Sequence, residues 1–405
     1  MKFNIWKDYP KMTLPDVLSF IVDNRGKTVP TTENGHILIA TNCVRNENLY
    51  PSYEKIRFLS EETYQTWFRA HPLPGDILFV CKGTPGRCCL VPDPLDFCIA
   101  QDMVALRANQ DIIYNYFLLA VLRSREIQLQ ITNTSVGDVI PHFKKSFFDR
   151  IMIPVPPLDI QKIIGNYYMA FSNKIEINKK INENLLEQAT ALFDNALQQS
   201  ESISFVELSS LADVKGGKRL PKGVNLISKP NSHPYIRVRN LNNMIFASLS
   251  SDYEYVDDET QKSIARYITS AGDVLVSIVG TIGLTAIVDD TLDNANLTEN
   301  CVKLTNLKGI TPEYLLLFLR SKIGIESINK GTVGAVQLKL PIKNIQSIPV
   351  PLLMSVEMQA LSDILSIMFN RISSNIIETK RLSELRDVLL PKLMSGELGV
   401  SDIDL

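Results

Sequence analysis

Hydrophobic and polar positions divide the chain into two kinds of segment. In the first kind, short alternating or continuous apolar runs are bounded by Gly, Pro and Asn, a pattern that predicts strands and turns. The clearest strand predictions are 37–40, 77–80, 235–238 and 274–279. Short apolar helices are predicted at 113–123 and 312–320, and Thr311 and Pro312 provide a good N-cap and first turn for the second helix.

The second kind of segment is a long helix. Apolar residues recur at spacings of three and four over 161–199 and again over 358–394, which predicts two long amphipathic helices. Pro391 indicates that the second helix bends or ends near Leu390. Stripes of this length favour coiled-coil packing, and the alternative is two unrelated helices that each cover their own domain. The residues expected to pair the helices or face a partner are Phe171, Ile175, Ile181, Leu185, Leu192, Leu365, Met368, Ile372, Leu385 and Leu389.

The two kinds of segment occur twice in the same order. Residues 75–86 align with 272–283 at an offset of 197, and the Ile-Pro-Val-Pro block at 153–156 recurs at 348–351. Two further blocks, YFLLAVLRS with YLLLFLRS and Ser-Val-Gly with Thr-Val-Gly, fall between these at nearly the same offset. A period near 200 residues is too long for a solenoid, so the sequence predicts a duplicated domain. The Ile-Pro-Val-Pro blocks should stay extended and separate each globular part from its helix.

Motifs for catalysis, metal binding and membrane insertion are missing from this pattern. The six cysteines have no zinc-type spacing and are predicted to be reduced thiols in a cytoplasmic protein. The four histidines lie in no HExxH motif and have no carboxylate partner nearby in the sequence. We also find no P-loop, no GxSxG nucleophile, no signal peptide and no apolar run that approaches the roughly 20 residues of a membrane span. The sequence therefore predicts no catalytic residue and no metal, and favours a binding protein over an enzyme.

Clusters of Lys and Arg permit DNA binding but are modest in size. The net charge is −2, so any electrostatic footprint for nucleic acid would have to be local. Two Gly-Thr-x-Gly segments, 83–86 and 280–283, are interpreted as strand-to-strand turns that could approach a DNA backbone. Arg237 and Arg239 are two apart on a predicted strand and so should share a face. Candidate DNA-binding residues are Arg25, Lys27, Lys82, Arg87, Lys218, Arg219, Lys222, Arg237 and Arg239. For any one of them the alternative is a solvated charged surface.

In the order of these motifs the chain resembles the specificity (S) subunits of type I restriction–modification systems. The resemblance rests on the Gly-Asp-Ile/Val-Leu strand, the Gly-Thr-x-Gly turn, the helix, the Ile-Pro-Val-Pro block and the Pro157-Leu-Asp-Ile-Gln161 entry to the long helix. Residues 23–28 (DNRGKT) and 389–398 (LLPKLMSGEL) are also typical of these subunits. The second copy departs from the first by three extra residues before Gln359, which leaves the start of its helix open.

The resemblance implies a fold and a set of partners. The expected fold class is α/β (α+β), with two target recognition domains of mixed strands and short helices, each followed by a long helix, and the two long helices paired as an antiparallel coiled coil. The expected segments are recognition domain 1 (1–156), spacer helix 1 (157–200), recognition domain 2 (201–351) and spacer helix 2 (352–405). The chain would bind double-stranded DNA at a bipartite, asymmetric target and dock methyltransferase and restriction (motor-nuclease) subunits. S-adenosylmethionine and ATP would bind to those partners and not to this chain.

Two other readings of the sequence remain open. The chain could be the recognition half of a single-chain restriction–methylation enzyme, or a coiled-coil scaffold with no role in DNA binding. Two helices of about 40 residues would each be about 60 Å long, at ~1.5 Å per residue. Such a pair could act as a spacer between two DNA-reading units.

Overall fold

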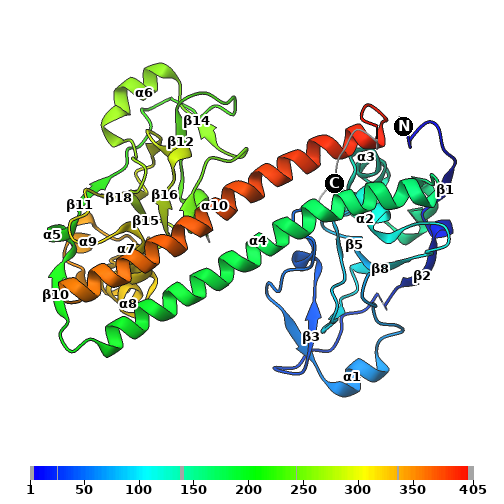
Figure 1. The fold of residues 1–405 in the computed structure, drawn as a ribbon, viewed down its shortest axis with the longest axis horizontal. Helices are drawn as coiled ribbons and strands as arrows, with labels where there is room; N and C mark the ends of the chain where they lie inside the picture. The colour runs from blue at the N-terminus through cyan, green and yellow to red at the C-terminus, as the bar shows by residue number, and fades with distance from the viewer. Residues whose placement is uncertain (1–3, 25, 137–140, 243, 335–336, 400–405) are drawn as a thin grey trace. The chain divides into compact units, whose positions relative to one another are not determined.

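A computed structural model describes residues 4–24, 26–136, 141–242, 244–334 and 337–399 of the chain. The chain forms two compact units, one comprising residues 1–180 with 376–405 and the other residues 181–375. Both long helices, α4 (Leu158–Gln199) and α10 (Ser355–Met394), contribute to both units (Figure 1). The two units are described separately below.

The first unit contains two sheets and a two-stranded ribbon. In the ribbon, β1 pairs antiparallel with β9. The larger sheet has the order β2-β8-β5-β6, and the smaller has the order β4-β3-β7, in which β3 pairs antiparallel with β4 and parallel with β7. The strands are β1 (Lys11–Thr13), β2 (Leu18–Val22), β3 (His36–Ile39), β4 (Arg57–Leu59), β5 (Ile77–Val80), β6 (Cys88–Leu90), β7 (Phe97–Ile99), β8 (Met103–Ala108) and β9 (Met152–Pro154). The shorter helices are α1 (Glu61–Thr66), α2 (Asn115–Arg123) and α3 (Arg125–Thr134), with 3-10 turns at Pro15–Val17, Thr41–Cys43 and Lys145–Arg150.

The second unit repeats this plan. Its ribbon pairs β10 with β19, its larger sheet has the order β11-β18-β15-β16-β13, and its smaller sheet has the order β14-β12-β17. The strands are β10 (Ser204–Glu207), β11 (Asp213–Gly216), β12 (Pro234–Ile236), β13 (Phe246–Ala247), β14 (Glu254–Tyr255), β15 (Val274–Ser277), β16 (Thr285–Val288), β17 (Asn296–Leu297), β18 (Cys301–Thr305) and β19 (Pro349–Leu352). The helices are α5 (Leu208–Leu211), α6 (Asp258–Ile264), α7 (Pro312–Arg320), α8 (Lys322–Gly331) and α9 (Ile342–Gln346), with 3-10 turns at Val238–Leu241, Ala265–Tyr267 and Asp290–Leu292.

The predicted mixed α/β architecture with a duplicated unit is confirmed. The Ile-Pro-Val-Pro blocks are extended, as expected, and form the ribbon strands β9 and β19. The Gly-Thr-x-Gly segments connect the antiparallel pairs β5–β6 and β15–β16. Gly83, Gly86, Gly280 and Gly283 all have φ between 82° and 89°, a left-handed conformation that glycine adopts without steric cost.

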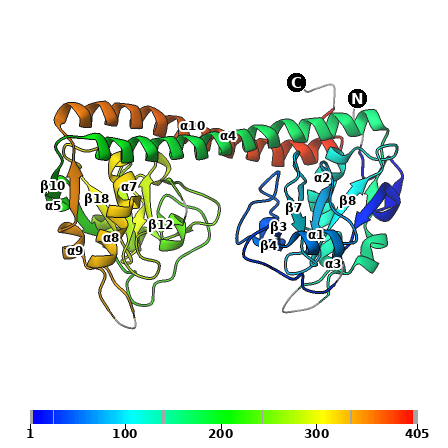
Figure 2. The ribbon, with the colours of Figure 1, turned by 90° about the horizontal axis from the view of Figure 1, so that it is seen from below.

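The core of each unit lies between the larger sheet and the long helices. Helix α2 is buried from Phe117 to Leu122, and α7 is buried from Tyr314 to Leu319, so each short helix is covered on all sides. Side chains of α2 and of the first part of α4 share one core in the first unit, while α7 shares a core with both long helices in the second. Figure 2 shows that within each unit the strands lie on one side of the helix pair. Burial of these apolar faces supplies the main stabilisation of each unit.

A half-buried arginine lies at the C-terminal end of the short helix in each copy. Arg123 donates hydrogen bonds to the Cys88 and Asn48 carbonyls and, over 2.6 Å, to the Tyr168 hydroxyl on α4. Arg320, 197 residues later, donates to the carbonyls of Thr285 and Met244. A guanidinium has five N–H donors in a fixed fork, which suits it to several backbone acceptors at once. The two copies therefore attach the helix to the hairpin strand in the same way.

Helices α4 and α10 pair in an antiparallel orientation, as predicted. In the first unit, Asn178 Nδ2 donates to Glu378 Oε2 over 2.8 Å and the Arg386 guanidinium lies over the Tyr168 ring. In the second unit, Asn375 Nδ2 donates to Asn182 Oδ1 over 2.8 Å, and near the other end of α4 Ser200 Oγ donates to Glu357. Along these contacts the residue numbers on α4 increase while those on α10 decrease, as in an antiparallel pair.

Two details of the predicted elements need correction. Of the two outcomes predicted at Pro391, an end of the helix near Leu390 is not found, because α10 continues through Pro391 to Met394. Its last turn buries Leu393 and Met394, and the Met394 carbonyl accepts a hydrogen bond from the Ile5 amide. These interactions offset the hydrogen bond that proline cannot donate. The predicted strand 235–238 is also shorter, because the chain enters a 3-10 turn at Val238.

The residues expected to pair the helices or face a partner differ in burial. Ile175, Leu365, Met368 and Ile372 are buried, and Phe171, Ile181, Leu185 and Leu389 are half-buried. Leu192 and Leu385 are 38% and 39% exposed, so their side chains lie on the surface of the helix pair. On α4, the residues near Leu192 that are buried are Ala189 and Phe193. A spacing of three or four residues identifies a stripe but does not decide which of two adjacent positions turns inward, because the helical period is not an integer.

Candidate nucleic-acid interface

Three of the predicted arginines line one cleft in the second unit. The cleft has a volume of about 380 Å³ and is lined by Arg219, Arg237 and Arg239 together with the 298–300 segment. Its walls come from the loop after β11, the segment after β12 and the turn after β17. These residues are far apart in the sequence, so the folded chain concentrates positive charge that the overall charge of −2 does not reveal.

The basic loop that follows β11 is held against the turn after β17. The Lys218 amide donates to the Leu297 carbonyl over 2.8 Å, and its carbonyl accepts from the Tyr235 hydroxyl over 2.9 Å. A Cβ at Gly217 would lie 2.0 Å from the Thr298 carbonyl oxygen. This distance is too short for any side chain at this position. The Lys218 ammonium lies over the Tyr267 ring, 5.4 Å from its centroid. Lys218 and Lys222 are exposed, so this loop presents cations beside the cleft.

Arg219 forms an ion pair with Glu299 at one wall of the cleft, with Nε 2.7 Å from Oε1. Partial burial raises the pKa of Glu299, but hydrogen bonds from Arg219, its own backbone amide and Thr298 outweigh this effect and lower it. The hydrogen bond to Glu299 in turn raises the pKa of Arg219. Both groups are therefore ionised at neutral pH, and the exposed guanidinium keeps further donors for another acceptor.

Arg237 and Arg239 both bind the carboxylate of Glu254. Arg237 Nη1 lies 2.5 Å and Arg239 Nη2 lies 2.9 Å from Glu254 Oε2. The two arginines were expected on one face of a strand, but β12 ends at Ile236, and both belong to the cap and first turn of the following 3-10 helix. They come together because they share a carboxylate. Glu254, on β14, was not identified from the sequence, since no local pattern links it to arginines 15 and 17 positions earlier.

The candidate residues of the first unit are more scattered. Lys27 and Lys82 are exposed, and Arg87 is half-buried at the end of the Gly-Thr-Pro-Gly turn. The turn lies beside the segment before Phe143, because Lys82 and His142 form an antiparallel bridge and the Gly83 amide donates to the Pro141 carbonyl. Arg25 lies outside the described residues.

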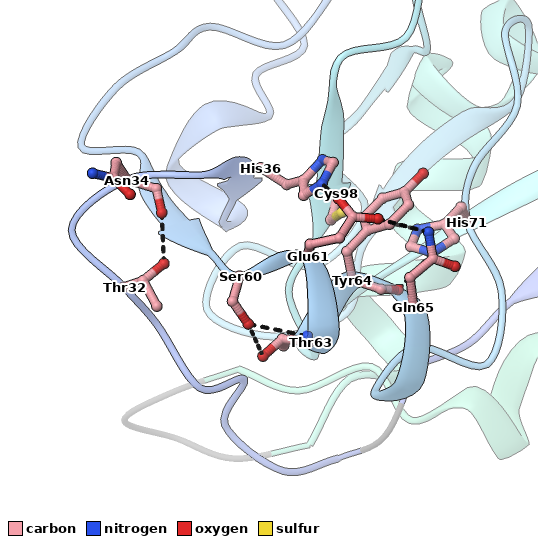
Figure 3. A network of polar contacts seen from close by, with 10 residues as sticks. All are labelled: Thr32, Asn34, His36, Ser60, Glu61, Thr63, Tyr64, Gln65, His71 and Cys98. Carbon is pink, nitrogen blue, oxygen red and sulfur yellow. Dashed lines mark hydrogen bonds and ion pairs between the residues drawn. The ribbon is translucent and has the colours of Figure 1, made fainter.

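A polar and aromatic network not predicted from the sequence covers the smaller sheet of the first unit (Figure 3). His36 Nε2 lies 2.5 Å from Glu61 Oε2, and the His36 ring stacks on Tyr64, whose other face stacks on His71. The second unit has the same histidine–carboxylate hydrogen bond between His233 and Asp258, at 2.9 Å. The absence of a nearby carboxylate in the sequence was therefore misleading, because both partners lie 25 residues away. Comparison of the two copies would have found them, since both pairs obey the offset of 197.

The structure also describes the cysteines and tests the chain for metal clusters and membrane-spanning helices. All six cysteines are free thiols and are buried. Among the described residues, no group of three or more His, Cys, Asp and Glu side chains is arranged to hold a metal ion. No helix in the described part of the chain is long and apolar enough to span a membrane.

Comparisons with known proteins agree with the duplicated architecture. A family model described as "Type I restriction modification DNA specificity domain" matches the chain twice, over residues 7–187 and 201–386. The HindI type I restriction enzyme specificity subunit of Haemophilus influenzae is 21% identical over 411 residues, which cover 80% of this chain and 86% of that protein. The MjaVIII specificity subunit of Methanocaldococcus jannaschii is 21% identical over 322 residues, covering 76% and 75%.

Among solved structures, the S subunit of a type I restriction–modification system from M. genitalium has a similar fold. The match has a TM-score of 0.55 and 17% sequence identity, and it covers 97% of this chain and 98% of that chain. The likeness extends over both units and both long helices.

Proposed function

Because the chain belongs to the type I restriction–modification DNA specificity family, we propose that its two units each bind one half of a bipartite, asymmetric DNA target. The chain is a non-catalytic DNA-recognition subunit of such a system. The observation that carries the proposal is the cleft of the second unit, where Arg219, Arg237 and Arg239 gather. Arginine is suited both to guanine edges in the major groove and to phosphates. The candidate cations of the first unit, among them Lys27, Lys82 and Arg87, are placed differently, as two different half-sites would require.

The helix pair is proposed to dock the methyltransferase subunits. Several large apolar side chains of α4 and α10 remain exposed, including Ile177 and Val388 in the first unit and Val356 and Ile367 in the second. Val356 is 80% and Ile367 is 71% exposed. Ile364 is also exposed and lies three residues before Ile367 on α10, so these two side chains share one face of the helix. Neighbouring apolar side chains on an exposed face are typical of a protein interface. Restriction subunits would join the assembled complex, and S-adenosylmethionine and ATP would bind to the partner subunits.

DNA recognition is tested with the chain in complex with its methyltransferase subunit. Sequencing of methylated bases in a host that carries both genes identifies the target, and binding is then measured on that duplex and on a scrambled one. The triple variant K218A/R219A/K222A should weaken binding to the target by at least tenfold, because it removes up to three cationic contacts to DNA. Unchanged binding by this variant would show that the three residues are only surface charge. Equal binding of the unaltered complex to both duplexes would contradict sequence recognition and favour a scaffold.

Docking is tested separately by co-purification. I367D and V388D place a charge on the exposed faces of α10 and should reduce recovery of the methyltransferase subunit while leaving the unfolding transition unchanged. The matched control is K380Q, a charge change on the same helix. Full recovery with both variants would place the docking surface elsewhere.

A further inference from the structure

The smaller sheets of the two units share one backbone frame. In the second unit Tyr235 pairs with Glu254, and in the first unit Leu38 pairs with Arg57; both members of the second pair lie 197 residues after those of the first. Helices α1 and α6 begin at residues 61 and 258, again 197 apart. Positions in the two smaller sheets and in the turns that follow β3 and β12 can therefore be matched residue by residue.

The side chains at the matched positions differ in charge. Arg237, Arg239 and Glu254 of the second unit correspond to Ala40, Asn42 and Arg57 of the first. Both sets are compatible with the same strand pairing and the same following 3-10 turn. The fold therefore requires neither set, and the difference concerns what each unit binds.

The geometry of the second unit makes Glu254 the centre of its set. Both guanidiniums contact a single oxygen, Glu254 Oε2. Glu254 is 28% exposed, while Arg237 and Arg239 are 45% and 52% exposed. Arg239 Nη2 also reaches the Asp252 carbonyl, and the Arg237 amide donates to Asn240 Oδ1. The less exposed carboxylate thus restrains two more exposed cations that line the cleft, and the three charges together leave a net charge of +1.

We propose that Glu254 is a positioning residue that holds Arg237 and Arg239 so that one of the two guanidiniums reads a guanine in the half-site of the second unit. Guanine presents two acceptors, N7 and O6, in the major groove, which match the parallel donors of a guanidinium. A shared carboxylate lowers the repulsion between the two arginines and limits their rotamers before DNA binds. In the first unit, Ala40, Asn42 and Arg57 give a different preference. This inference rests on the proposed function of DNA recognition.

The experiment uses the complex with the methyltransferase subunit and duplexes that carry the target identified from methylated bases. Each guanine of the two half-sites is replaced in turn by 7-deazaguanine, which keeps base pairing but lacks the N7 acceptor. The unaltered complex should lose affinity at one guanine of one half-site. The loss should be smaller than the roughly 5- to 150-fold range for a whole bidentate contact, because the O6 acceptor remains. The quantity compared is the ratio of the affinity for the unmodified duplex to the affinity for the 7-deazaguanine duplex. E254Q removes the charge and should abolish most of this ratio at that guanine alone. E254D keeps the charge and should restore part of it, which a merely structural role would not explain.

The matched control is E259Q, the same substitution at an exposed position on α6 of the same unit, and it should leave every ratio unchanged. R57Q should change ratios only in the other half-site. The inference is overturned if E254Q leaves the ratio at every guanine unchanged. It is also overturned if E254Q weakens binding equally on all duplexes, scrambled DNA included, because the arginines would then contact phosphates. If the unaltered complex binds target and scrambled DNA equally, the proposed function itself fails, so the two failures are distinguishable.

Discussion

His233 Nε2 lies 2.9 Å from Asp258 Oδ1, and the same relationship joins His36 to Glu61 in the first unit. His36 is the first residue of β3 and His233 immediately precedes β12, and in both copies the carboxylate lies in the first turn of the following helix. The pair therefore ties a strand to a helix in each unit. In the first unit the His36 ring also stacks on Tyr64, which stacks on His71. The position of the second unit that matches His71 is Ile268, which does not titrate.

The stacked His71 should make the first unit less stable in mild acid. Burial lowers the pKa of His71 below its ordinary value of 6.5; a hydrogen bond to the Tyr64 carbonyl opposes this effect and nearby His36 adds to it. Between the lowered pKa and 6.5 the unfolded chain binds more protons than the folded one. The contribution of neutral His71 to the free energy of unfolding is therefore complete above pH 6.5. It is lost as the pH falls from 6.5 to the lowered pKa of His71 in the folded protein.

This pH dependence can be measured by tryptophan fluorescence, since Trp6 and Trp67 both lie in the first unit. The denaturant concentration at the unfolding midpoint should be lower at pH 5.5 than at pH 7.5, and H71Q should make this difference smaller. H142Q, a change of a half-buried histidine in the same unit, is the control. Identical pH profiles for H71Q and the unaltered chain would contradict the prediction.

Gly217 should be intolerant of even one methyl group. A Cβ there would meet the Thr298 and Leu297 carbonyl oxygens at 2.0 and 2.4 Å, and neither backbone atom can move without disturbing β17. G217A should destabilise the second unit by about 1–3 kcal/mol and weaken its half-site binding. G26A, where a Cβ meets nothing within 4 Å, should change neither the denaturation curve nor DNA binding. A normal curve for G217A would mean that the loop can relax.

The helix pair should respond to substitutions according to burial and not according to spacing. Leu365 is fully buried in the second unit, whereas Ile367, two residues later on the same helix, is 71% exposed. L365A should lower the free energy of unfolding by about 2–5 kcal/mol because it leaves a cavity. I367A should cost less than about 0.5 kcal/mol. Chemical denaturation of both variants measures these values, and equal losses would place Ile367 in a packed environment that the free chain does not show.

The cysteine thiols should be unreactive in the folded protein. Burial raises the pKa of Cys81, Cys98 and Cys301 to about 12, and the thiolate is the reactive form. All six thiols are also buried, so at pH 8 a disulfide reagent should label none of them in the native chain and all six after denaturation. Rapid labelling of any thiol before unfolding would contradict the burial of that side chain.

Local rules in the sequence determined much of this protein. The duplication follows from recurring blocks, and β5 and α7 have the residues predicted for them. The long helices follow from a sustained apolar period, and the Gly-Thr-x-Gly hairpins follow from the conformational freedom of glycine. Each of these signals is carried by neighbours in the chain, so it can be read without the fold.

The tertiary structure decided the relationships between distant residues. It places residues 376–405 in the first unit, turns Phe193 inward and leaves Leu192 on the surface, and carries α10 through Pro391. It also brings Glu254 to Arg237 and Arg239, and His36 to Glu61. The physical reason is the same in each case. A contact between residues far apart in the chain depends on which buried surfaces pack together, and no periodicity or spacing within one segment contains that information.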